Sequence, residues 1–253
     1  MSGTRGDFSL SLIRYPLSPG ARFLRESFPA FRESNTRSYL PLWSNLLTLS
    51  IEEVNHLKHA PDVDGVLPVF HRRWSPRSFS DRDVTSGDLA KVFEAARWAA
   101  SSYNEQPWRW LVGRRNSGTY NKILDSLMPF NQAWASNAPV LILGTAKTTF
   151  SHNDAPNRVA LYDLGAASSY LTLQAAAVGL VAHQMAGFDQ DLARKSLAIA
   201  EDFLIGAVIA LGYQGAPASL SNEQMLAQEE APRQRKPLSE IVLSSWDSPA
   251  DLG

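Results

Sequence analysis

The feature that most constrains the fold is a long segment of small residues, Arg158 to Val178, in the second half of the chain. It is rich in Ala, Gly and Ser, and Gly179 follows it as a typical C-terminal stop. We expect a long helix here, whose small side chains let neighbouring elements approach closely. Around it, apolar runs predict strands at Trp108 to Arg114, Pro139 to Thr145 and Phe203 to Gly212.

Further helices are predicted between these strands, but at irregular spacing. Periodic apolar residues and capping residues indicate helices at Ile51 to His59, Leu89 to Ala100, Tyr120 to Met128 and Asp189 to Leu197. Regular βαβ spacing is missing from the sequence, and so is a Gly-x-Gly-x-x-Gly turn. The pattern therefore favours an α+β fold over a dinucleotide-binding parallel sheet.

A polar segment, Ser101 to Trp108, directly follows one predicted helix. Asn104 and Gln106 stand two residues apart, on what we expect to be an extended segment that enters a strand. Donors and acceptors along such an edge suit a planar ring that is rich in heteroatoms. The alternative is a polar cap or turn at the helix end.

Two short basic clusters lie far apart in the chain. One runs from Arg72 to Phe79, and the other from Arg233 to Pro237. Because the arginine side chain is a planar, permanently charged fork, both suit contacts to phosphate and could converge on one. The alternative is a pair of solvated basic loops. The formal net charge of -1 argues against a nucleic-acid partner.

Together, these segments resemble the FMN-dependent nitroreductase family over roughly residues 66 to 245. The order and spacing of the motifs are those of the family. Its motifs are matched by Arg73, Ser75, Arg77 and Phe79, by Ser101, Ser102, Asn104, Gln106, Pro107 and Trp108, by Tyr162 to Ala167, by Met185 to Asp189, and by Arg233 to Pro237.

The resemblance implies a set of FMN-binding residues. They are Arg73, Trp74, Ser75, Arg77, Ser101, Ser102, Asn104, Ala186, Gly187, Arg233 and Arg235. It implies that Arg73, Ser75, Arg233 and Arg235 hold the phosphate, that Arg77 lies beside the ring, that Ser101, Ser102 and Asn104 line the ring of the other subunit, and that the backbone at Ala186 and Gly187 faces flavin N5. No side chain is assigned as catalytic, because the flavin carries the chemistry.

The implied fold is a mostly antiparallel central sheet flanked by helices, built as an intertwined homodimer. The implied activity is a ping-pong transfer of electrons from NADH or NADPH, through FMN, to a small organic acceptor such as a nitroaromatic, a quinone or an enone-like compound. The alternative is a flavin-binding relative that is not a reductase: it has no turnover, destroys its flavin, removes a halogen or oxidises a peptide azoline. The acceptor and the choice of nicotinamide stay open.

Two side chains near these motifs carry open interpretations. Glu105 is expected to face solvent or to restrict the substrate mouth. His183 is expected either to donate a proton to substrate or to be structural. Better-known members of the family carry a glutamate where this chain has Ala186, which puts a carboxylate role there in doubt.

We divide the chain into an N-terminal extension at residues 1–65, an FMN-binding domain at residues 66–245 and a tail at residues 246–253. The extension is expected to be an arm plus a short helix, with a transit peptide as the alternative. Without cysteine the chain has no thiolate metal site, and we expect no metal. No apolar run reaches the roughly 20 residues of a membrane span, so we expect a cytoplasmic protein without a membrane partner.

Overall fold

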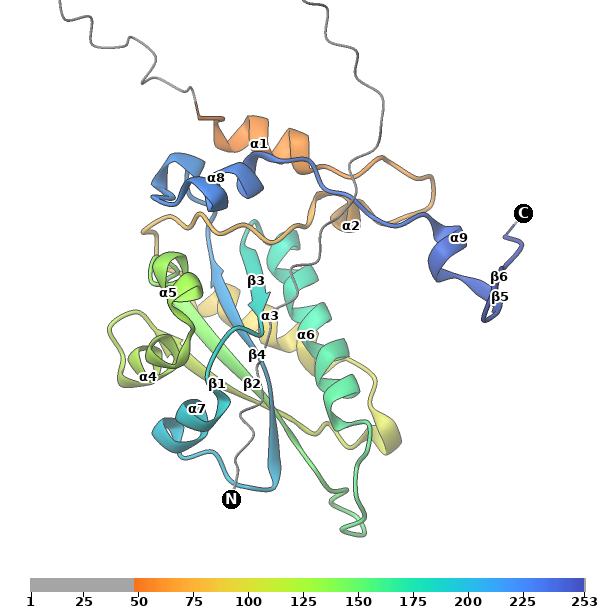
Figure 1. Ribbon diagram of the computed structural model, residues 1–253. Helices are drawn as coiled ribbons and strands as arrows, with labels where there is room; N and C mark the ends of the chain where they lie inside the picture. Colours follow the sequence, from red (N-terminus) through yellow and green to blue (C-terminus); the bar gives the residue numbers. More distant parts are fainter. Residues whose placement is uncertain (1–47, 253) are drawn as a thin grey trace, which may run out of the picture. The chain divides into compact units, whose positions relative to one another are not determined.

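Four antiparallel strands form the central sheet, in the order β1-β2-β4-β3 (Figure 1). The strands are β1 (Trp108–Arg114), β2 (Val140–Lys147), β3 (Val181–Met185) and β4 (Phe203–Gly212). The computed structural model describes residues 48–252, so the N-terminal arm expected before residue 48 lies outside the described residues. All of these residues belong to one of the two compact units into which the chain divides.

Helices cover both faces of this sheet. The helices of the described residues, not all of which contact the sheet, are α1 (Ile51–Lys58), α2 (Pro68–Arg72), α3 (Ser86–Arg97), α4 (Gly118–Ser126), α5 (Pro129–Ala135), α6 (Ala160–Ala177), α7 (Gln190–Leu197), α8 (Glu223–Glu230) and α9 (Leu238–Ile241). Short turns η1 (Ser102–Asn104) and η2 (Pro217–Ser219) and a hairpin of β5 (Leu243–Ser245) and β6 (Ser248–Pro249) complete the chain.

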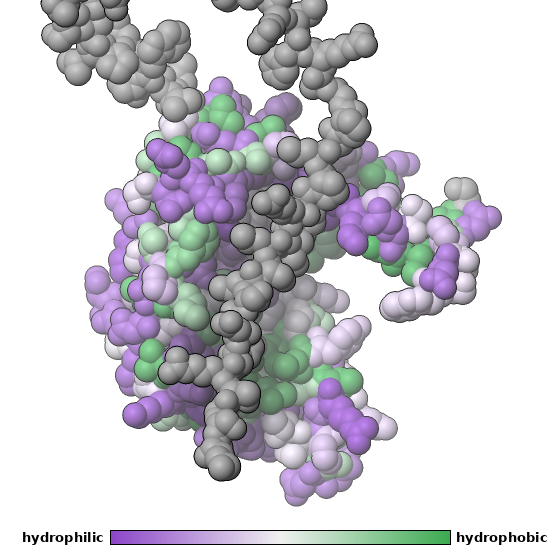
Figure 2. Space-filling model, in the orientation of Figure 1, coloured by the Kyte–Doolittle hydropathy of each residue, from purple (hydrophilic) through white to green (hydrophobic). Residues whose placement is uncertain are grey.

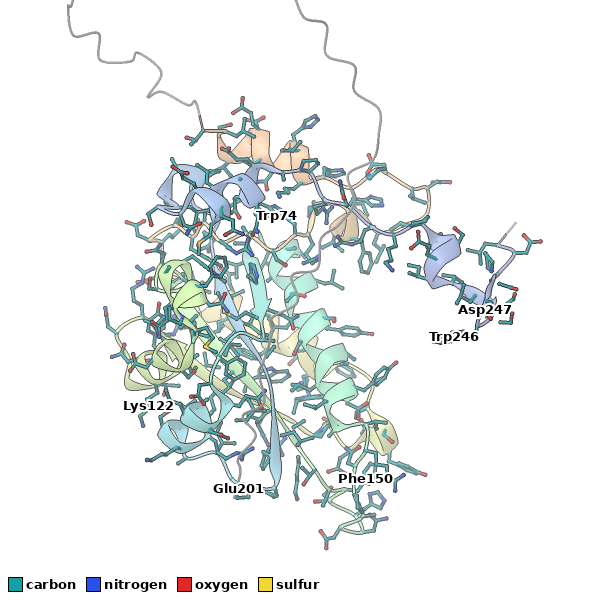
Figure 3. All side chains as sticks on the ribbon, viewed as in Figure 1. Trp74, Lys122, Phe150, Glu201, Trp246 and Asp247 are labelled. Atoms are coloured by element: carbon teal, nitrogen blue, oxygen red, sulfur yellow. The ribbon has the colours of Figure 1, made fainter. Side chains whose placement is uncertain are left out.

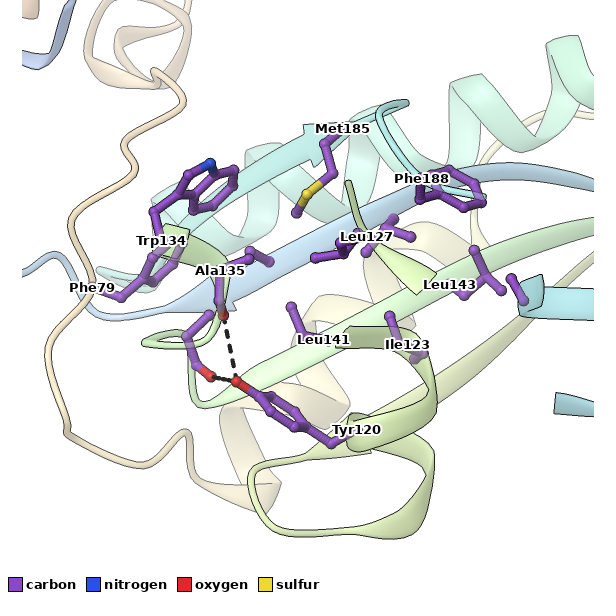
Figure 4. Close-up of a cluster of buried hydrophobic side chains, with 14 of the residues drawn as sticks. Phe79, Tyr120, Ile123, Leu127, Trp134, Ala135, Leu141, Leu143, Met185 and Phe188 are labelled. Atoms are coloured by element: carbon purple, nitrogen blue, oxygen red, sulfur yellow. Dashed lines mark hydrogen bonds between the residues drawn. The ribbon is translucent and has the colours of Figure 1, made fainter. Parts of the chain in front are cut away.

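The central strand β2 is buried on both sides. Because side chains alternate along a strand, Val140 and Ile142 belong to the apolar cluster beneath α3 and α6. Leu141 and Leu143 belong to the opposite cluster, with side chains from α4 and α5 (Figure 4). The sheet is therefore the middle layer between two groups of helices, and the predicted α+β class is confirmed.

The long helix α6 lies close to the sheet, as expected for a helix of small residues. A Cβ atom on Gly206 would lie only 2.6 Å from Cδ2 of Leu164. Glycine at this position of β4 therefore leaves the space that the Leu164 side chain fills. None of the helices in the described part of the chain is long and apolar enough to cross a membrane.

Local capping residues explain where several helices begin. Ser50 and Glu53 form the capping box predicted for α1: Ser50 Oγ accepts from the Glu53 N–H at 3.2 Å, and the Glu53 carboxylate accepts from the Ser50 N–H at 2.7 Å. The helix α3 begins three residues earlier than predicted because Thr85 caps it, accepting from the Asp88 N–H at 3.0 Å. The short elements α2, α5, α8, α9 and β3 were not predicted.

Candidate functional site

Two arginines from distant parts of the chain meet beside α2. Arg73 is the residue that ends this helix, and Arg233 follows α8. Arg233 Nη1 donates to the Arg73 carbonyl at 2.6 Å, and its Nη2 donates to the His71 carbonyl. The two basic clusters therefore converge, as expected for a phosphate site.

The charges of this cluster are close enough to disfavour one another. Burial, and then the charge of Arg235, lower the pKa of Arg73. Burial, and then Arg235 and Arg73, lower the pKa of Arg233. Within residues 48–252 none of the three forms an ion pair with a carboxylate. The cluster thus carries surplus positive charge, which an anion would offset.

The loop that follows Arg73 brings two further predicted residues to the cluster. Ser75 Oγ accepts from Arg73 Nη1 at 3.3 Å. The Arg77 guanidinium lies 5.8 Å from the Phe130 ring, and burial lowers its pKa. The Nε atoms of Arg77 and Arg233 are buried without a hydrogen-bond partner. Unpaired guanidinium donors in a surplus of positive charge fit a phosphate group well.

Trp74, a buried residue of this loop, contacts the helix α1. Its Nε1 donates to Asn55 Oδ1 at 2.9 Å, and Lys58 Nζ lies 4.9 Å from its ring centre. Both partners belong to α1. Trp74 therefore joins α1 to the loop. Figure 3 labels it beside α1 and α8.

The serine and asparagine segment has a different shape from the one predicted. Instead of an extended edge it forms the turn η1, in which Tyr103 and Asn104 have φ values of 52° and 53°, and Gln106 just after it has a φ of 52°. The cause is local: the Asn104 and Glu105 N–H groups donate back to the carbonyls of Ser101 and Ser102, both at 3.0 Å. The expectation that Asn104 and Gln106 share one flat edge was wrong.

This turn is fixed to the start of α6. The Ser102 N–H donates to the Asp163 carboxylate at 3.1 Å, and Ser101 Oγ accepts from the Gln106 N–H at 2.9 Å. Asp163 is buried, with 4% of its surface exposed. Its position near a helix start also suits the helix dipole.

The arginine cluster and the serine turn lie at opposite ends of α6. Ser102 bonds to Asp163 in the first turn of the helix. Arg73 instead lines a cavity of about 650 Å³ together with Thr172 and Ala176, near the last turn. Nine residues of α-helix rise roughly 14 Å. Figure 3 shows the same separation, with Trp74 beside α1 and α8 and Phe150 at the other end.

The predicted pair Ala186 and Gly187 forms the turn after β3. The Gly187 carbonyl accepts from the Met128 N–H and from Asn131 Nδ2, both at 3.0 Å. A Cβ on Gly187 would lie 2.6 Å from that same Asn131 Nδ2. Contacts from α5 and the residue before it therefore fix the backbone here, and glycine leaves the necessary room.

The structural interpretation of His183 is favoured by its contacts. Its Nδ1 lies 3.0 Å from the Pro76 carbonyl, and its ring lies 4.6 Å from Trp134. Burial lowers its pKa from the ordinary 6.5 to about 4. Histidine at neutral pH is then uncharged, and Nδ1–H donates to Pro76.

Glu105 does not simply face solvent. Its carboxylate accepts from both the N–H and the hydroxyl of Ser151, each at 3.0 Å. It therefore ties the connection between β2 and α6 to the turn η1.

Sequence reasoning missed one buried acid, Glu229 of α8, with 1% of its surface exposed. It accepts hydrogen bonds from Arg77 and Ser78, about 150 positions earlier in the chain. Nearby Lys58, with 5% exposed, was missed as well. A contact over this separation leaves no local pattern in a single sequence.

Known proteins are similar to this chain in sequence and in fold. The nitroreductase family model matches residues 71–129 and 113–213. An uncharacterized 15.4 kDa protein of Mycolicibacterium smegmatis is 31% identical over 149 residues, which are 56% of this chain and 99% of that protein. A Thermus thermophilus NADH dehydrogenase is 28% identical over 214 residues, covering 72% and 97% of the two chains. The crystal structure of an oxidoreductase containing FMN superposes with a TM-score of 0.69 at 30% identity, covering 76% and 97%. The chain therefore belongs to the nitroreductase family.

Proposed function

We propose that this protein is an FMN-dependent oxidoreductase, which passes electrons from NADH or NADPH to a small organic acceptor by a ping-pong mechanism. The observation that carries the proposal is the surplus of positive charge where Arg73, Arg233 and Arg235 meet. Support also comes from similar proteins, one named NADH dehydrogenase and another described as an oxidoreductase containing FMN.

In this proposal the chain's own residues bind and orient the cofactor, and FMN supplies the hydride and electron transfer. Arg73, Arg233 and Arg235, with Ser75, hold the phosphate. Arg77 places a positive charge beside the ring, and the backbone at Ala186 and Gly187 contacts the ring edge.

We further propose that Ser101, Ser102 and Asn104 line the ring bound by a second subunit. The reason is their distance from the arginines of the same chain, since the two groups lie at opposite ends of α6. Two copies related by symmetry would bring the serine turn of one to the arginine cluster of the other. The functional unit is then a homodimer.

The visible spectrum of the purified protein tests the assignment directly. We expect yellow protein that releases FMN, and not FAD, on denaturation. Anaerobic NADH or NADPH should bleach the flavin, and a nitroaromatic or a quinone should restore the colour. Protein that stays colourless after FMN is added would overturn the cofactor, and coloured protein that neither nicotinamide bleaches would overturn the donor.

A further inference from the structure

Glu229 is a buried carboxylate that the proposed function does not use. Its Oε1 accepts from the Arg77 N–H at 3.1 Å, the Ser78 N–H at 3.0 Å and the Ser78 hydroxyl at 2.6 Å. Its Oε2 accepts from the Arg77 N–H at 3.0 Å. Two consecutive backbone N–H groups of the arginine loop therefore point at this side chain, an arrangement that proteins use to bind anions.

The surroundings of Glu229 are strongly basic. Lys58 of α1 interacts electrostatically with Glu229, Arg77 and Arg233, and its Nζ donates to the Gln228 carbonyl at 2.8 Å. Burial lowers the pKa of Lys58, and the charge of Glu229 opposes that effect. Two cations, Lys58 and Arg77, thus interact with this one carboxylate.

The backbone bonds to Glu229 limit how this loop can hold a phosphate. The N–H groups of Arg77 and Ser78 already have a charged acceptor, which is stronger than a neutral one. A phosphate would then be held by the side chains of the arginines, whose directions depend on how the loop is placed. The residue that places the loop is on α8, outside the segments 71–129 and 113–213 that the family model matches.

We propose that Glu229 is a positioning residue, which fixes the loop from Arg73 to Ser78 so that Arg73 reaches the FMN phosphate and Arg77 reaches the ring. This inference rests on the proposed function. A positioning role and simple electrostatics predict opposite changes in FMN affinity when Glu229 loses its charge. A carboxylate among phosphate-binding cations opposes phosphate binding, so loss of its charge alone would tighten FMN binding. Loss of its positioning role would weaken it.

The variant Glu229→Gln separates the two effects, because it keeps the size of the side chain and removes the charge. The amide places N–H donors against the N–H groups of the loop, so the loop should move. We expect FMN affinity to fall on the order of 10-fold or more, the scale of a lost hydrogen bond to a charged group. With saturating FMN, the reduction potential of the bound flavin should fall as Arg77 moves away, whereas loss of a nearby negative charge alone would raise it.

Glu230→Gln is the matched control. Glu230 is the next residue of α8, and its carboxylate accepts from the Leu49 N–H at 2.7 Å instead of from the loop. The Glu230→Gln variant also removes one negative charge, and its FMN affinity and flavin reduction potential should stay near the wild-type values. If Glu229→Gln does not fold, Ser78→Ala removes the 2.6 Å hydroxyl bond and keeps the charge, with weaker FMN binding and a lower potential expected.

Each outcome decides the inference. Unchanged or tighter FMN binding by Glu229→Gln would overturn the positioning role. If Glu229→Gln does not fold, the same result for Ser78→Ala would overturn it. Weaker binding with an unmoved potential would make the residue merely structural, which also overturns it. A wild-type protein that does not bind FMN would overturn the proposed function instead, so the two failures are distinguishable.

Discussion

At the scale of single residues, the chemistry of the site depends on which arginine contacts which part of a ligand. Arg73 lies with Arg233 at the end of α2, while Arg77 lies beside Phe130 at the start of α5. The two side chains are only four positions apart but have different surroundings. If FMN binds here, one arginine should govern how tightly it binds and the other how readily it is reduced.

Arg73→Ala should weaken FMN binding on the order of 10- to 100-fold, because it removes a charge-assisted hydrogen bond worth roughly 1.5–3 kcal/mol. Excess FMN should restore turnover, since the surroundings of the ring are unchanged.

Arg77→Ala should instead lower the reduction potential of the bound flavin, and its turnover should stay slow when the protein is saturated with FMN. Flavin titration and potentiometry measure both effects. Exposed Lys122 of α4 supplies the control, Lys122→Ala, and an unmoved potential in Arg77→Ala would contradict its role.

The buried imidazole of His183 makes stability depend on pH. Its pKa is about 4 in the folded chain and 6.5 ordinarily, mainly because of burial, with Arg77 and Arg73 nearby. The unfolded state therefore binds the proton first as the pH falls. We expect the free energy of unfolding to drop by up to roughly 3 kcal/mol between pH 6.5 and pH 4. Urea denaturation across this range measures the change.

His183→Gln is the control for that measurement. Glutamine can still donate to the Pro76 carbonyl but does not titrate in this range. The variant should lose less stability between pH 6.5 and pH 4 than the wild type. Parallel curves for the two proteins would show that other groups cause the pH dependence.

Sequence patterns predicted which segments meet better than they predicted the geometry of those segments. The hypothesis that the two basic clusters converge agrees with the Arg233 bond to the Arg73 carbonyl, and their phosphate role stays a prediction. The predicted shape of the segment around η1 was wrong, because hydrogen bonds within the turn hold its residues in the left-handed conformation. None of these residues is glycine, so the sequence carries no local signal of that conformation. Glu229 was missed because its partners lie about 150 positions away. Motifs are visible as local patterns in a single sequence, whereas contacts between residues far apart in the chain are not.

At the scale of elements, long periodic segments were predicted well and short ones were not. The strands β1 and β4 have the bounds expected, and α6 differs from its predicted range by only a few residues. The strand β3 was missed, since it has five residues and mixes polar with apolar side chains. Its place at the sheet edge comes from pairing with β4, which a single sequence does not display.

The contact between β1 and α4 depends on one glycine. A Cβ on Gly113 would lie 2.4 Å from both the Cα and the N of Tyr120, and these backbone atoms can move only with the helix. The Tyr120 hydroxyl also donates to the Ala138 carbonyl at 2.8 Å (Figure 4), so α4 is held in place. We expect Gly113→Ala to lower the free energy of unfolding by about 1–3 kcal/mol.

Gly118→Ala is the matched control, because its Cβ would meet nothing within 4 Å. It lies in the first turn of α4, where alanine favours the helix by up to roughly 1 kcal/mol. Chemical denaturation at equal flavin content should therefore show loss of stability for Gly113→Ala only. Equal stability of the two variants would mean that α4 shifts at little cost.

At the scale of the whole molecule, the outward face of α6 has no partner among the described residues. The helix is apolar on nearly all sides, yet Leu161, Tyr162 and Tyr170 are 45%, 80% and 46% exposed. Figure 2 shows green, apolar side chains over this region. Helices that are apolar all round are usually buried, so a second copy of the chain is the expected cover.

Gly165→Glu tests this assembly without disturbing the single chain. Gly165 is exposed in the first half of α6, and a Cβ there meets nothing within 4 Å. We expect wild-type protein to be a dimer with an interface of at least roughly 2,000 Å². Since a buried, unpaired carboxylate is costly, the variant should be monomeric with an unchanged far-UV circular dichroism spectrum.

The monomer should also lose FMN. The arginine cluster and the serine turn of one chain lie at opposite ends of α6, and in the proposed dimer a second chain brings them together. Light scattering with in-line absorbance measures mass and flavin content together. Asn121→Glu adds the same charge to an exposed position of α4 and should remain a flavin-loaded dimer. A flavin-loaded monomer of Gly165→Glu would show that one chain completes the site alone, and the shared-site proposal would then be wrong.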